Sequence, residues 1–202
     1  MNARILEVSQ PVQVTNALGE FALTAYLIAE GQRVDTHLAL THGNLTAPVP
    51  MRINSACLTS EVLQDNRCDC AWQMWESLKR FVSRGQGILT YHPAHEGRGA
   101  GLFQKIQSYA LMDRDGLTTA AAFTALGEPP DSRDYSAATA ILVALGIDEV
   151  ELLSNNPNKI ESLVMAGIRV TASERVIGRH NPAWRRYLNS KAEAFGHLIE
   201  RA

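Results

Sequence analysis

Residues 150–172 read VELLSNNPNKIESLVMAGIRVTA. The apolar segments VELLS and IRVTA predict two buried strands, and the residues between them predict a helix that begins at Pro157 and ends at Gly167. Two strands joined by one helix of this length pair in parallel through a right-handed crossover. This stretch therefore predicts an α/β fold whose C-terminal part is a strand–helix–strand unit.

The N-terminal part has a pattern that is typical of antiparallel strands. Apolar stretches between residues 4 and 50 are interrupted at Leu18-Gly19 and at Glu30-Gly31, as expected of hairpin turns. A further strand, MRINSACL, follows at residues 51–58 and delivers Cys57 at its end. We therefore expect one three-layered domain over residues 1–202, with a mixed sheet and a β-rich N-terminal portion.

Helices and strands alternate in the middle of the chain. After Cys70, apolar residues recur every three or four positions and predict one buried helix face, formed by Trp72, Trp75, Leu78 and Val82. The segment ILTYH (88–92) predicts a strand, and EGRGAGL (96–102) predicts a glycine-rich turn into the helix FQKIQSYALMD (103–113).

Two further helices are predicted near the C-terminus. The segment DSRDYSAATAILVALG (131–146) indicates a helix with Asp131 or Ser132 at its N-cap and Gly146 after its end. The tail PAWRRYLNSKAEAFGHLIERA (182–202) indicates a final amphipathic helix, with Trp184, Leu188 and Leu198 facing inward.

The composition is that of a globular protein and does not by itself indicate a function. Of 202 residues, 46% are hydrophobic and 20% are charged, which excludes a disordered chain. The net charge of −2 argues against a nucleic-acid partner, and no apolar run is long enough to span a membrane. The start MNARILEVSQPVQV shows no secretory signal, so an odd thiol count favours the reducing cytoplasm.

The three cysteines form the clearest candidate site. Cys57, Cys68 and Cys70 are the whole thiol content and follow a C-x10-C-x-C pattern. Three thiolates without a fourth ligand suit a Zn²⁺ ion that keeps one position for water, as hydrolytic zinc sites do. The alternative is that they are buried structural cysteines, which behave as small apolar residues.

Three other segments carry chemistry but are ambiguous alone. The glycines of EGRGAGL would let the backbone come close to a ligand, and the N-terminus of the following helix would offer N–H groups to an anion. Glycines of a tight turn with a surface arginine explain the same segment equally well. Asp131 and Arg133 are either a helix cap with a solvated arginine or a reactive pair. SNNPNK (154–159) brings hydroxyl, amide and ammonium groups to the carboxyl end of a parallel strand, where ligands bind, or it caps a helix.

Taken in order, these segments resemble the GTP cyclohydrolase II family, zinc enzymes that open the guanine ring of GTP at the start of riboflavin synthesis. The resemblance covers the chain from about residue 50 to its end. Its motifs in this sequence are R-x-x-S-x-C-L-T, R-C-D-C-x-x-Q, YH…EGRG-x-GL, YAL, DSRDY, LL-S-NNP-x-K and KAEAFGHL.

The resemblance implies a role for each matching residue. The three cysteines would bind one Zn²⁺ per chain, which activates water to open the ring at C8 and release formate. Asp131 resembles the proton acceptor, Arg133 the nucleophile toward the α-phosphorus, and Tyr109 the tyrosine near the guanine. Because arginine is protonated at neutral pH, its own chemistry favours a charge clamp on the departing pyrophosphate.

Nucleotide contacts are also implied by the resemblance. Gln73 matches a contact to the base, and the segment from Glu96 to Arg98 matches the part that handles the triphosphate, with Mg²⁺ as its counter-ion. Family members resemble homodimers, so a homodimer is expected. The matching positions are Arg52, Ser55, Gln73, Glu96, Gly97, Arg98, Thr119, Ser154 and Lys159.

This chain departs from the family pattern beside the substrate. The usual R-x-H-S-E-C-L-T-G-D is R-I-N-S-A-C-L-T-S-E here, so Asn54 replaces a histidine, Ala56 a glutamate and Ser60-Glu61 a Gly-Asp pair. Losing a charged group beside a zinc ligand changes metal affinity by about 10–100-fold. Ser154 also replaces the usual threonine, and AAAFTALG (120–127) lacks the usual polar residues.

The loop from His92 to Glu96 is one residue longer than usual, and His95 occupies the extra position. Neither His92 nor His95 is expected to bind the metal.

Three hypotheses follow from the whole sequence. The first is a working GTP cyclohydrolase II, the second is a paralogue that uses the same zinc chemistry on another nucleotide or heterocycle, and the third is a non-catalytic nucleotide-binding zinc protein.

Overall fold

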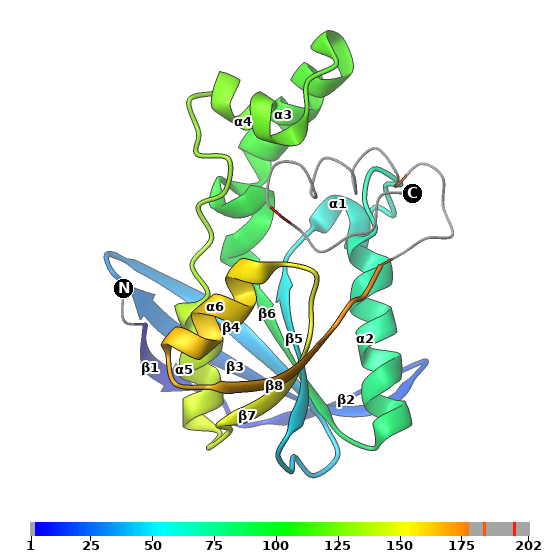
Figure 1. The fold of residues 1–202 in the computed structure, drawn as a ribbon, viewed down its shortest axis with the longest axis vertical. Coiled ribbons are helices and arrows are strands. Elements are labelled where there is room, and N and C mark those ends of the chain that lie inside the picture. The colour runs from blue at the N-terminus through cyan, green and yellow to red at the C-terminus, as the bar shows by residue number, and fades with distance from the viewer. Residues whose placement is uncertain (1–2, 178–183, 185–195, 197–202) are drawn as a thin grey trace.

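The computed structural model describes residues 3–177 and positions 184 and 196. Within these residues, eight strands form one mixed sheet in the order β1-β3-β4-β6-β5-β7-β8, and β2 pairs with β3 outside this path. Figure 1 shows helices packed around this sheet. The predicted α/β class with a mixed sheet is confirmed.

The N-terminal half of the sheet is antiparallel, as predicted. β3 pairs antiparallel with β1, β2 and β4, and Gly31 has a φ of 64° in the turn that joins β3 to β4. Glycine reaches this left-handed conformation without steric cost. The strands are β1 (Arg4–Val8), β2 (Val12–Asn16), β3 (Gly19–Glu30) and β4 (Arg33–His42).

The other half of the sheet is parallel and contains the predicted strand–helix–strand unit. β7 pairs in parallel with β8, and α6 connects them. Asn156 caps α6 by accepting a hydrogen bond from the N–H of Asn158, and Pro157 takes the first helical position, as predicted. The elements are β5 (Val49–Ser55), β6 (Gly87–His92), β7 (Glu149–Leu153), α6 (Pro157–Met165) and β8 (Arg169–Glu174).

Two apolar cores lie on opposite faces of the sheet, because neighbouring residues of a strand point to opposite sides. On one face, Ile88 belongs to a core with Ile141 of α5 and Leu163 of α6. On the other face, Leu89 belongs to a core with Phe81 of α2. The three predicted layers are therefore present. The helices of the outer layers are α2 (Cys70–Arg84), α5 (Ser136–Ala144) and α6.

The buried face of α2 differs in part from the predicted one. Leu78 and Phe81 are fully buried, whereas Trp75 is 39% exposed. The face turns toward Phe81 because that ring fills the core against β3 and β6. The helix ends at Gly85, which forms the C-cap with a φ of 71°.

The prediction that Asp131 or Ser132 caps a helix is wrong. α5 begins at Ser136, and Tyr135 occupies the N-cap. Residues 131–134 instead cross the site as a loop, because the N–H of Ser132 donates to the carbonyl of Arg98 at 3.0 Å. Gly146 follows the end of α5 with a φ of 70°, as predicted.

Four short or peripheral elements complete the description, and two of them, α1 and α4, were not predicted. α3 and α4 extend away from the sheet at one end of the molecule (Figure 1). Except for positions 184 and 196, the predicted C-terminal helix, with Leu188 and Leu198, lies outside the described residues. The elements are α1 (Leu58–Glu61), η1 (Pro93–Gly99), α3 (Gly101–Asp115) and α4 (Thr119–Ala125).

Within the part of the chain that the structure describes, no helix is both long and apolar enough to cross a membrane.

Candidate active site

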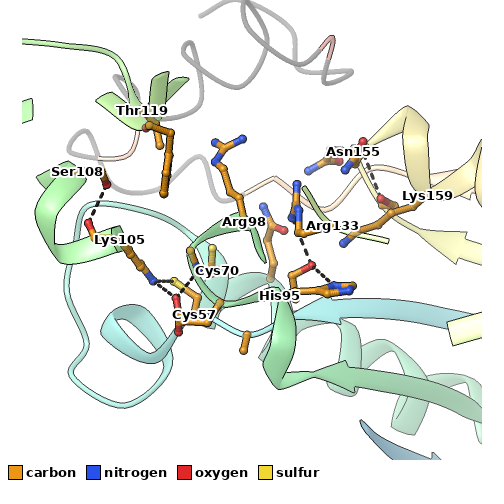
Figure 2. A pocket seen from close by; sticks show the side chains of 18 of the residues that line it. Cys57, Cys70, His95, Arg98, Lys105, Ser108, Thr119, Arg133, Asn155 and Lys159 are labelled. Atoms are coloured by element: carbon orange, nitrogen blue, oxygen red, sulfur yellow. Dashed lines mark hydrogen bonds and ion pairs between the residues drawn. The ribbon is translucent and has the colours of Figure 1, made fainter. Parts of the chain in front are cut away.

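The carboxyl ends of three parallel strands meet at one edge of the sheet. β5 ends at Ser55, β6 ends at His92, and Ser154 follows β7. Ligands of open α/β sheets bind outside these ends. A cavity lies at this edge, and side chains from β5, α2, η1, α3, α4, α6 and the loop before α5 line it (Figure 2).

Most of the predicted site residues line this cavity. The remaining two adjoin it, since Cys68 contacts Cys57 and Asp131 binds Arg133. The predicted residues in the lining are Arg52, Ser55, Cys57, Cys70, Gln73, Glu96, Gly97, Arg98, Tyr109, Thr119, Arg133, Ser154 and Lys159.

The cavity has a strong excess of positive charge. Among the described lining residues, one carboxylate, that of Glu96, stands against five cationic side chains. Walls of one sign concentrate ligands of the opposite sign. The cavity therefore suits an anionic ligand, although the whole chain carries a net charge of −2. The cations are Arg52, Arg98, Lys105, Arg133 and Lys159.

The three cysteines converge at one end of the cavity. Their sulfur atoms lie within 4.8 Å of one another, and the Sγ atoms of Cys57 and Cys68 are 3.6 Å apart. Tetrahedral zinc with Zn–S bonds of about 2.3 Å places two sulfurs about 3.8 Å apart. Hydrogen bonds from Cys68 and Cys70 lower the pKa of the Cys57 thiol, which favours the thiolate that metals bind. The donor set therefore fits Zn²⁺.

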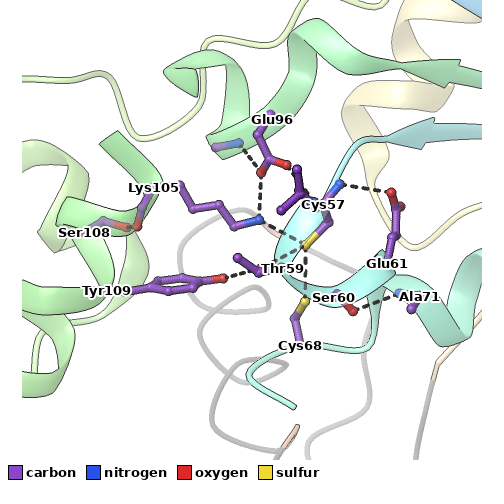
Figure 3. Close-up of polar contacts among 12 residues, drawn as sticks. Cys57, Thr59, Ser60, Glu61, Cys68, Ala71, Glu96, Lys105, Ser108 and Tyr109 are labelled. Atoms are coloured by element: carbon purple, nitrogen blue, oxygen red, sulfur yellow. Dashed lines mark hydrogen bonds and ion pairs between the residues drawn. The ribbon is translucent and has the colours of Figure 1, made fainter. Parts of the chain in front are cut away.

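Lys105 adds a cation to the cysteine cluster that the sequence did not reveal. Its Nζ donates to the Sγ of Cys57 at 3.1 Å and to the Oε1 of Glu96 at 2.7 Å (Figure 3). Burial alone would lower the pKa of Lys105, but the negative charges of Cys57 and Glu96 raise it overall. The ammonium therefore stays charged beside the thiolate.

Glu61 supports Cys57 from the other side. Its Oε2 accepts hydrogen bonds from the N–H of Cys57 at 3.3 Å and from the hydroxyl of Tyr91 at 2.6 Å. Its Oε1 accepts from the Nδ2 of Asn54 at 2.8 Å. Asn54 and Glu61 are two of the positions at which this chain departs from the family pattern. Because they bind each other here, these departures form one connected arrangement.

Tyr109 lies beside the cysteines, on α3. Its hydroxyl is 3.2 Å from the Oγ1 of Thr59, which is itself 3.8 Å from the Sγ of Cys57. Burial raises the pKa of Tyr109 to about 12, so its phenol keeps its proton at neutral pH. A neutral phenol at this position can donate a proton or a hydrogen bond to a ligand in the cavity.

Arg52 and Gln73 form a hydrogen-bonded pair in the lining of the cavity. The NH2 of Arg52 donates to the Oε1 of Gln73 at 3.0 Å, and its Nε donates to the Oδ1 of Asn54 at 2.9 Å. The Nε2 of Gln73 donates in turn to Asp69 at 2.7 Å. Since Arg52 is 6% exposed and Gln73 8%, this network holds both groups in one orientation.

The loop from Glu96 to Arg98 has an unusual backbone. Gly97 and Arg98 have φ values of 57° and 59°, and a non-glycine residue in this region is uncommon. The loop also approaches residue 132 closely, because a Cβ at Gly99 would lie 2.5 Å from the Oγ of Ser132. Figure 2 shows the side chain of Arg98 directed into the cavity, whereas Glu96 turns toward Lys105.

Asp131 and Arg133 form an ion pair, and Figure 2 shows Arg133 between the cysteines and Lys159. The Nε of Arg133 donates to the Oδ1 of Asp131 at 2.8 Å, and its NH2 donates to the Oδ2. Burial alone would raise the pKa of Asp131, but these bonds hold it below the usual value. The third guanidinium nitrogen, NH1, donates to the Oγ of Ser55 at 3.3 Å. All three predicted residues therefore meet here.

Three further predicted residues line the cavity. The Nζ of Lys159 donates to the carbonyl of Ile53 at 2.7 Å, and the Oγ of Ser154 accepts from the N–H of Asn156 at 3.1 Å. The Oγ1 of Thr119 is buried and has no hydrogen-bond partner among the described residues. A buried hydroxyl without a partner is costly, so Thr119 offers a ligand in the cavity a hydroxyl group that needs a hydrogen-bond partner.

His92 and His95 bind elsewhere than at the cysteines. The Nδ1 of His92 is 2.8 Å from the Nδ1 of His37, and its Nε2 is 2.9 Å from Thr90. His95 contacts the Oγ of Ser55 and the carbonyl of Asp134. Within the described residues, the one group with metal-ligand geometry consists of the three cysteines.

Fold and site together define an α/β protein with a three-thiolate metal centre in a cationic cavity. A family model described as GTP cyclohydrolase II matches residues 7–176. The chain belongs to the GTP cyclohydrolase II family, a family of hydrolases.

Known relatives match most of the chain. A protein named GTP cyclohydrolase-2 from Proteus mirabilis is 41% identical over 199 residues, which cover 97% of this chain and 96% of that protein. Proteins of the same name from Enterobacter sp. and Escherichia coli O9:H4 are 40% and 41% identical and cover 90% and 82% of this chain, and 91% and 84% of their own lengths.

One solved structure is similar at lower identity. It is a two-domain 3,4-dihydroxy-2-butanone 4-phosphate synthase from A. baumannii, with 19% identity and a TM-score of 0.43. The match covers 87% of this chain and 41% of that one.

Proposed function

We propose that this chain is a GTP cyclohydrolase II that converts GTP to formate, pyrophosphate and 2,5-diamino-6-ribosylamino-4(3H)-pyrimidinone 5′-phosphate, the first step of riboflavin synthesis. One observation carries the proposal: the three cysteines and the five cations line or adjoin one cavity, in a member of this family. The reaction needs both, because a hydrolytic centre must act on the base of a highly charged nucleotide.

Cys57, Cys68 and Cys70 would hold one Zn²⁺. A zinc ion bound there supplies Lewis-acid chemistry and lowers the pKa of a water that it binds. Lys105 balances the thiolate charge at Cys57, and Glu61 fixes the backbone of Cys57 by accepting from its N–H. Tyr109 would hold a proton on its phenol oxygen at the edge of the guanine, ready for transfer to the opening ring.

The middle of the cavity would receive the guanine and ribose. Arg52 presents a guanidinium whose position Gln73 and Asn54 fix, and Gln73 would contact the base. Thr119 brings its buried hydroxyl without a partner to the same cavity. Ser154, which replaces the family threonine, keeps a hydroxyl at the end of β7.

The triphosphate would bind among the cations at the far end from the cysteines. Arg98 and Lys159 supply point charges, and the left-handed backbone at Gly97 directs Arg98 into the cavity. Mg²⁺ would accompany the triphosphate as a counter-ion. Glu96 supports this loop, since its carboxylate accepts from the N–H of Leu58 at 2.7 Å and from Lys105.

Asp131 and Arg133 would act at the α-phosphate. The carboxylate of Asp131 accepts two hydrogen bonds from the guanidinium of Arg133 and is placed to take a proton from it. With that proton removed, a guanidine nitrogen can attack the α-phosphorus while pyrophosphate leaves. With the proton retained, the same group stabilises the departing pyrophosphate by charge.

We also infer the setting of the enzyme. A cytoplasmic homodimer that acts on a small nucleotide, with neither nucleic acid nor a membrane as partner, fits the net charge of −2 and the free thiols. Leu102, Phe103 and Ile106 expose 39%, 74% and 49% of their surfaces on α3, and a second copy would cover such apolar area.

The direct test uses purified protein loaded with one equivalent of zinc and supplied with Mg²⁺ and GTP. We expect formate and pyrophosphate in equal amounts, together with the pyrimidine product. Cys68→Ser should abolish formate release, while pyrophosphate release survives in part because Asp131 and Arg133 are untouched. Intact GTP after incubation with equimolar zinc-loaded enzyme would exclude the proposed function.

A second candidate function is the same chemistry on a different nucleotide. It is favoured by α4, which brings the buried ring of Phe123 to the cavity and has alanines at 120–122, where the family usually has polar residues. A screen of purine and pyrimidine nucleoside triphosphates, with formate and pyrophosphate measured separately, decides between them. A kcat/KM for another nucleotide above that for GTP would favour this second function.

A further inference from the structure

His95 connects two segments that are far apart in the sequence. Its Nδ1 lies 3.2 Å from the Oγ of Ser55, at the end of β5. Its Nε2 lies 2.7 Å from the carbonyl oxygen of Asp134, in the loop before α5. The ring is held between two aromatic neighbours, stacked on His92 at 4.8 Å and in edge contact with Tyr135 at 5.3 Å. At 5% exposure, His95 has little freedom to move.

The two contacts determine where the protons lie. A carbonyl oxygen can only accept, so the Nε2 of His95 must carry the proton that it donates to Asp134. Burial and the charges of Arg133 and Lys159 lower the pKa of His95 to about 3, so the ring is neutral and its Nδ1 has a free lone pair. The hydroxyl of Ser55 therefore donates its hydrogen to His95.

This arrangement leaves Ser55 as an acceptor toward the cavity. Its hydroxyl donates its only hydrogen to His95, so its Oγ accepts a hydrogen bond from the NH1 of Arg133 at 3.3 Å. A guanidinium can only donate. Arg133 is consequently held at two edges, by the carboxylate of Asp131 on one side and by the hydroxyl of Ser55 on the other.

We propose that His95 is a positioning residue that, through Ser55 and the carbonyl of Asp134, holds the Arg133 guanidinium in its working orientation toward the α-phosphate. This inference rests on the proposed function, because it assigns the α-phosphate to the neighbourhood of Arg133. His95 occupies the extra position of the loop between His92 and Glu96. The extra residue of this loop therefore supplies the side chain that binds Ser55 and the carbonyl of Asp134.

Loss of His95 has two consequences. The hydroxyl of Ser55 becomes free to rotate and to donate to a phosphate oxygen, so it no longer presents a lone pair to Arg133. The loop at residues 131–134 also loses the hydrogen bond that ties the carbonyl of Asp134 to η1. A displacement of about 1 Å in a reacting group costs about 100-fold in rate.

The first test is His95→Phe, which keeps an aromatic ring between His92 and Tyr135 but removes both hydrogen bonds. With zinc-loaded protein, Mg²⁺ and GTP, we expect kcat for pyrophosphate release to fall by about 10–100-fold and KM to change by less than about threefold. The zinc content should stay at one equivalent, because His95 does not contact the cysteines. An unchanged kcat, or a rise in KM alone, would overturn the proposal.

A double-mutant cycle tests whether His95 acts through Ser55. If it does, His95→Phe combined with Ser55→Ala should be no slower than the slower single variant, within about twofold. Ser55→Thr, which keeps the hydroxyl, should retain most of the rate. Multiplied losses in the double variant would show that His95 and Ser55 act independently, contrary to the proposal.

Nitrogen NMR of the zinc-loaded protein without nucleotide separates this inference from the proposed function. We expect His95 as the neutral Nε2–H tautomer, with an Nδ1 resonance that shifts in Ser55→Ala and not in Thr46→Ala, a variant outside the cavity. A neutral Nδ1–H tautomer would overturn the inference even if GTP is turned over. If the wild-type enzyme released neither product, the proposed function would fail, whereas this spectrum would still decide the hydrogen-bond arrangement.

Discussion

The ammonium of Lys105 lies 3.1 Å from the thiolate sulfur of Cys57, although 48 positions separate the two residues in the sequence. Lys105 is 7% exposed and also binds Glu96, so three charged groups of alternating sign meet at one edge of the metal centre. Three thiolates around a divalent ion leave one excess negative charge. Lys105 compensates that charge inside a cavity that must also accept an anionic nucleotide.

Replacing Lys105 with methionine should weaken zinc binding. Methionine fills a similar volume but removes a charge that, together with the larger effect of hydrogen bonds from Cys68 and Cys70, lowers the pKa of the Cys57 thiol, so this pKa should rise. Groups that bind the ligands of a metal typically affect its affinity by about 10–100-fold. Competition with a chromophoric chelator at pH 7 measures this change, and Lys79→Met on the exposed face of α2 serves as control. Equal zinc affinities in the two variants would contradict the role of Lys105.

Glu61→Ala should destabilise the segment that carries Cys57. The substitution leaves the N–H of Cys57, the hydroxyl of Tyr91 and the Nδ2 of Asn54 without their acceptor. Each buried group that is left without a partner costs about 1–3 kcal/mol. Urea denaturation of the zinc-free protein should show this loss in the free energy of unfolding, whereas Glu20→Ala, on an exposed position of β3, should change it by less than about 0.5 kcal/mol.

The parts of the fold that follow local patterns could be predicted from the sequence. The unit β7–α6–β8 could be predicted because its strand and helix periodicities, Pro157 at the start of the helix and Gly167 after its end are all local signals. The cysteine centre was readable for the same reason, since its ligands lie within 14 consecutive residues. The family resemblance supplied the remaining predicted site residues, whose motifs are distant in sequence.

Contacts that only tertiary structure creates could not be predicted. Lys105 looks like any lysine of an amphipathic helix until α3 packs beside η1. In the sequence, Asp131 looks like a helix cap. In the structure, its carboxylate accepts hydrogen bonds from Arg133, and the N–H of Ser132 donates to the carbonyl of Arg98. The tertiary contacts of the site therefore override the preference of these residues for a helix N-cap. Local sequence rules are expected to fail at functional sites of this kind.

The stability of the protein should fall in acid in a way that depends on His95. Its pKa is lowered to about 3 in the folded protein, chiefly by burial, against about 6.5 in the unfolded chain. Between these values the unfolded state binds one more proton, so the stabilisation is complete above pH 6.5 and is lost progressively as the pH falls toward 3. This group alone contributes a slope of about 1.4 kcal/mol per pH unit.

His95→Phe should remove that part of the slope. Urea denaturation of zinc-free wild-type and variant protein between pH 7 and pH 4.5 measures both free energies of unfolding. The difference between the two proteins should shrink or reverse by about 1.4 kcal/mol for each pH unit below 6. Because the other titrating groups are common to both proteins, parallel curves would mean that His95 titrates normally and is not held neutral by its surroundings.

Asp131→Asn should separate the two halves of the proposed reaction. An asparagine keeps the size of the side chain, but it turns one acceptor into a donor that faces the guanidinium of Arg133 and removes the group able to take its proton. Loss of a positioned proton acceptor costs about 100–10,000-fold in rate. We expect pyrophosphate release to fall by that factor, with the zinc content unchanged, because Asp131 binds Arg133 rather than the cysteines.

Arg133→Lys keeps the charge without the paired hydrogen bonds. If Arg133 acts as nucleophile, Arg133→Lys should be as slow as Asp131→Asn; if it acts only as a charge clamp, it should retain at least a tenth of the wild-type rate. Full activity in Asp131→Asn would remove this pair from the reaction.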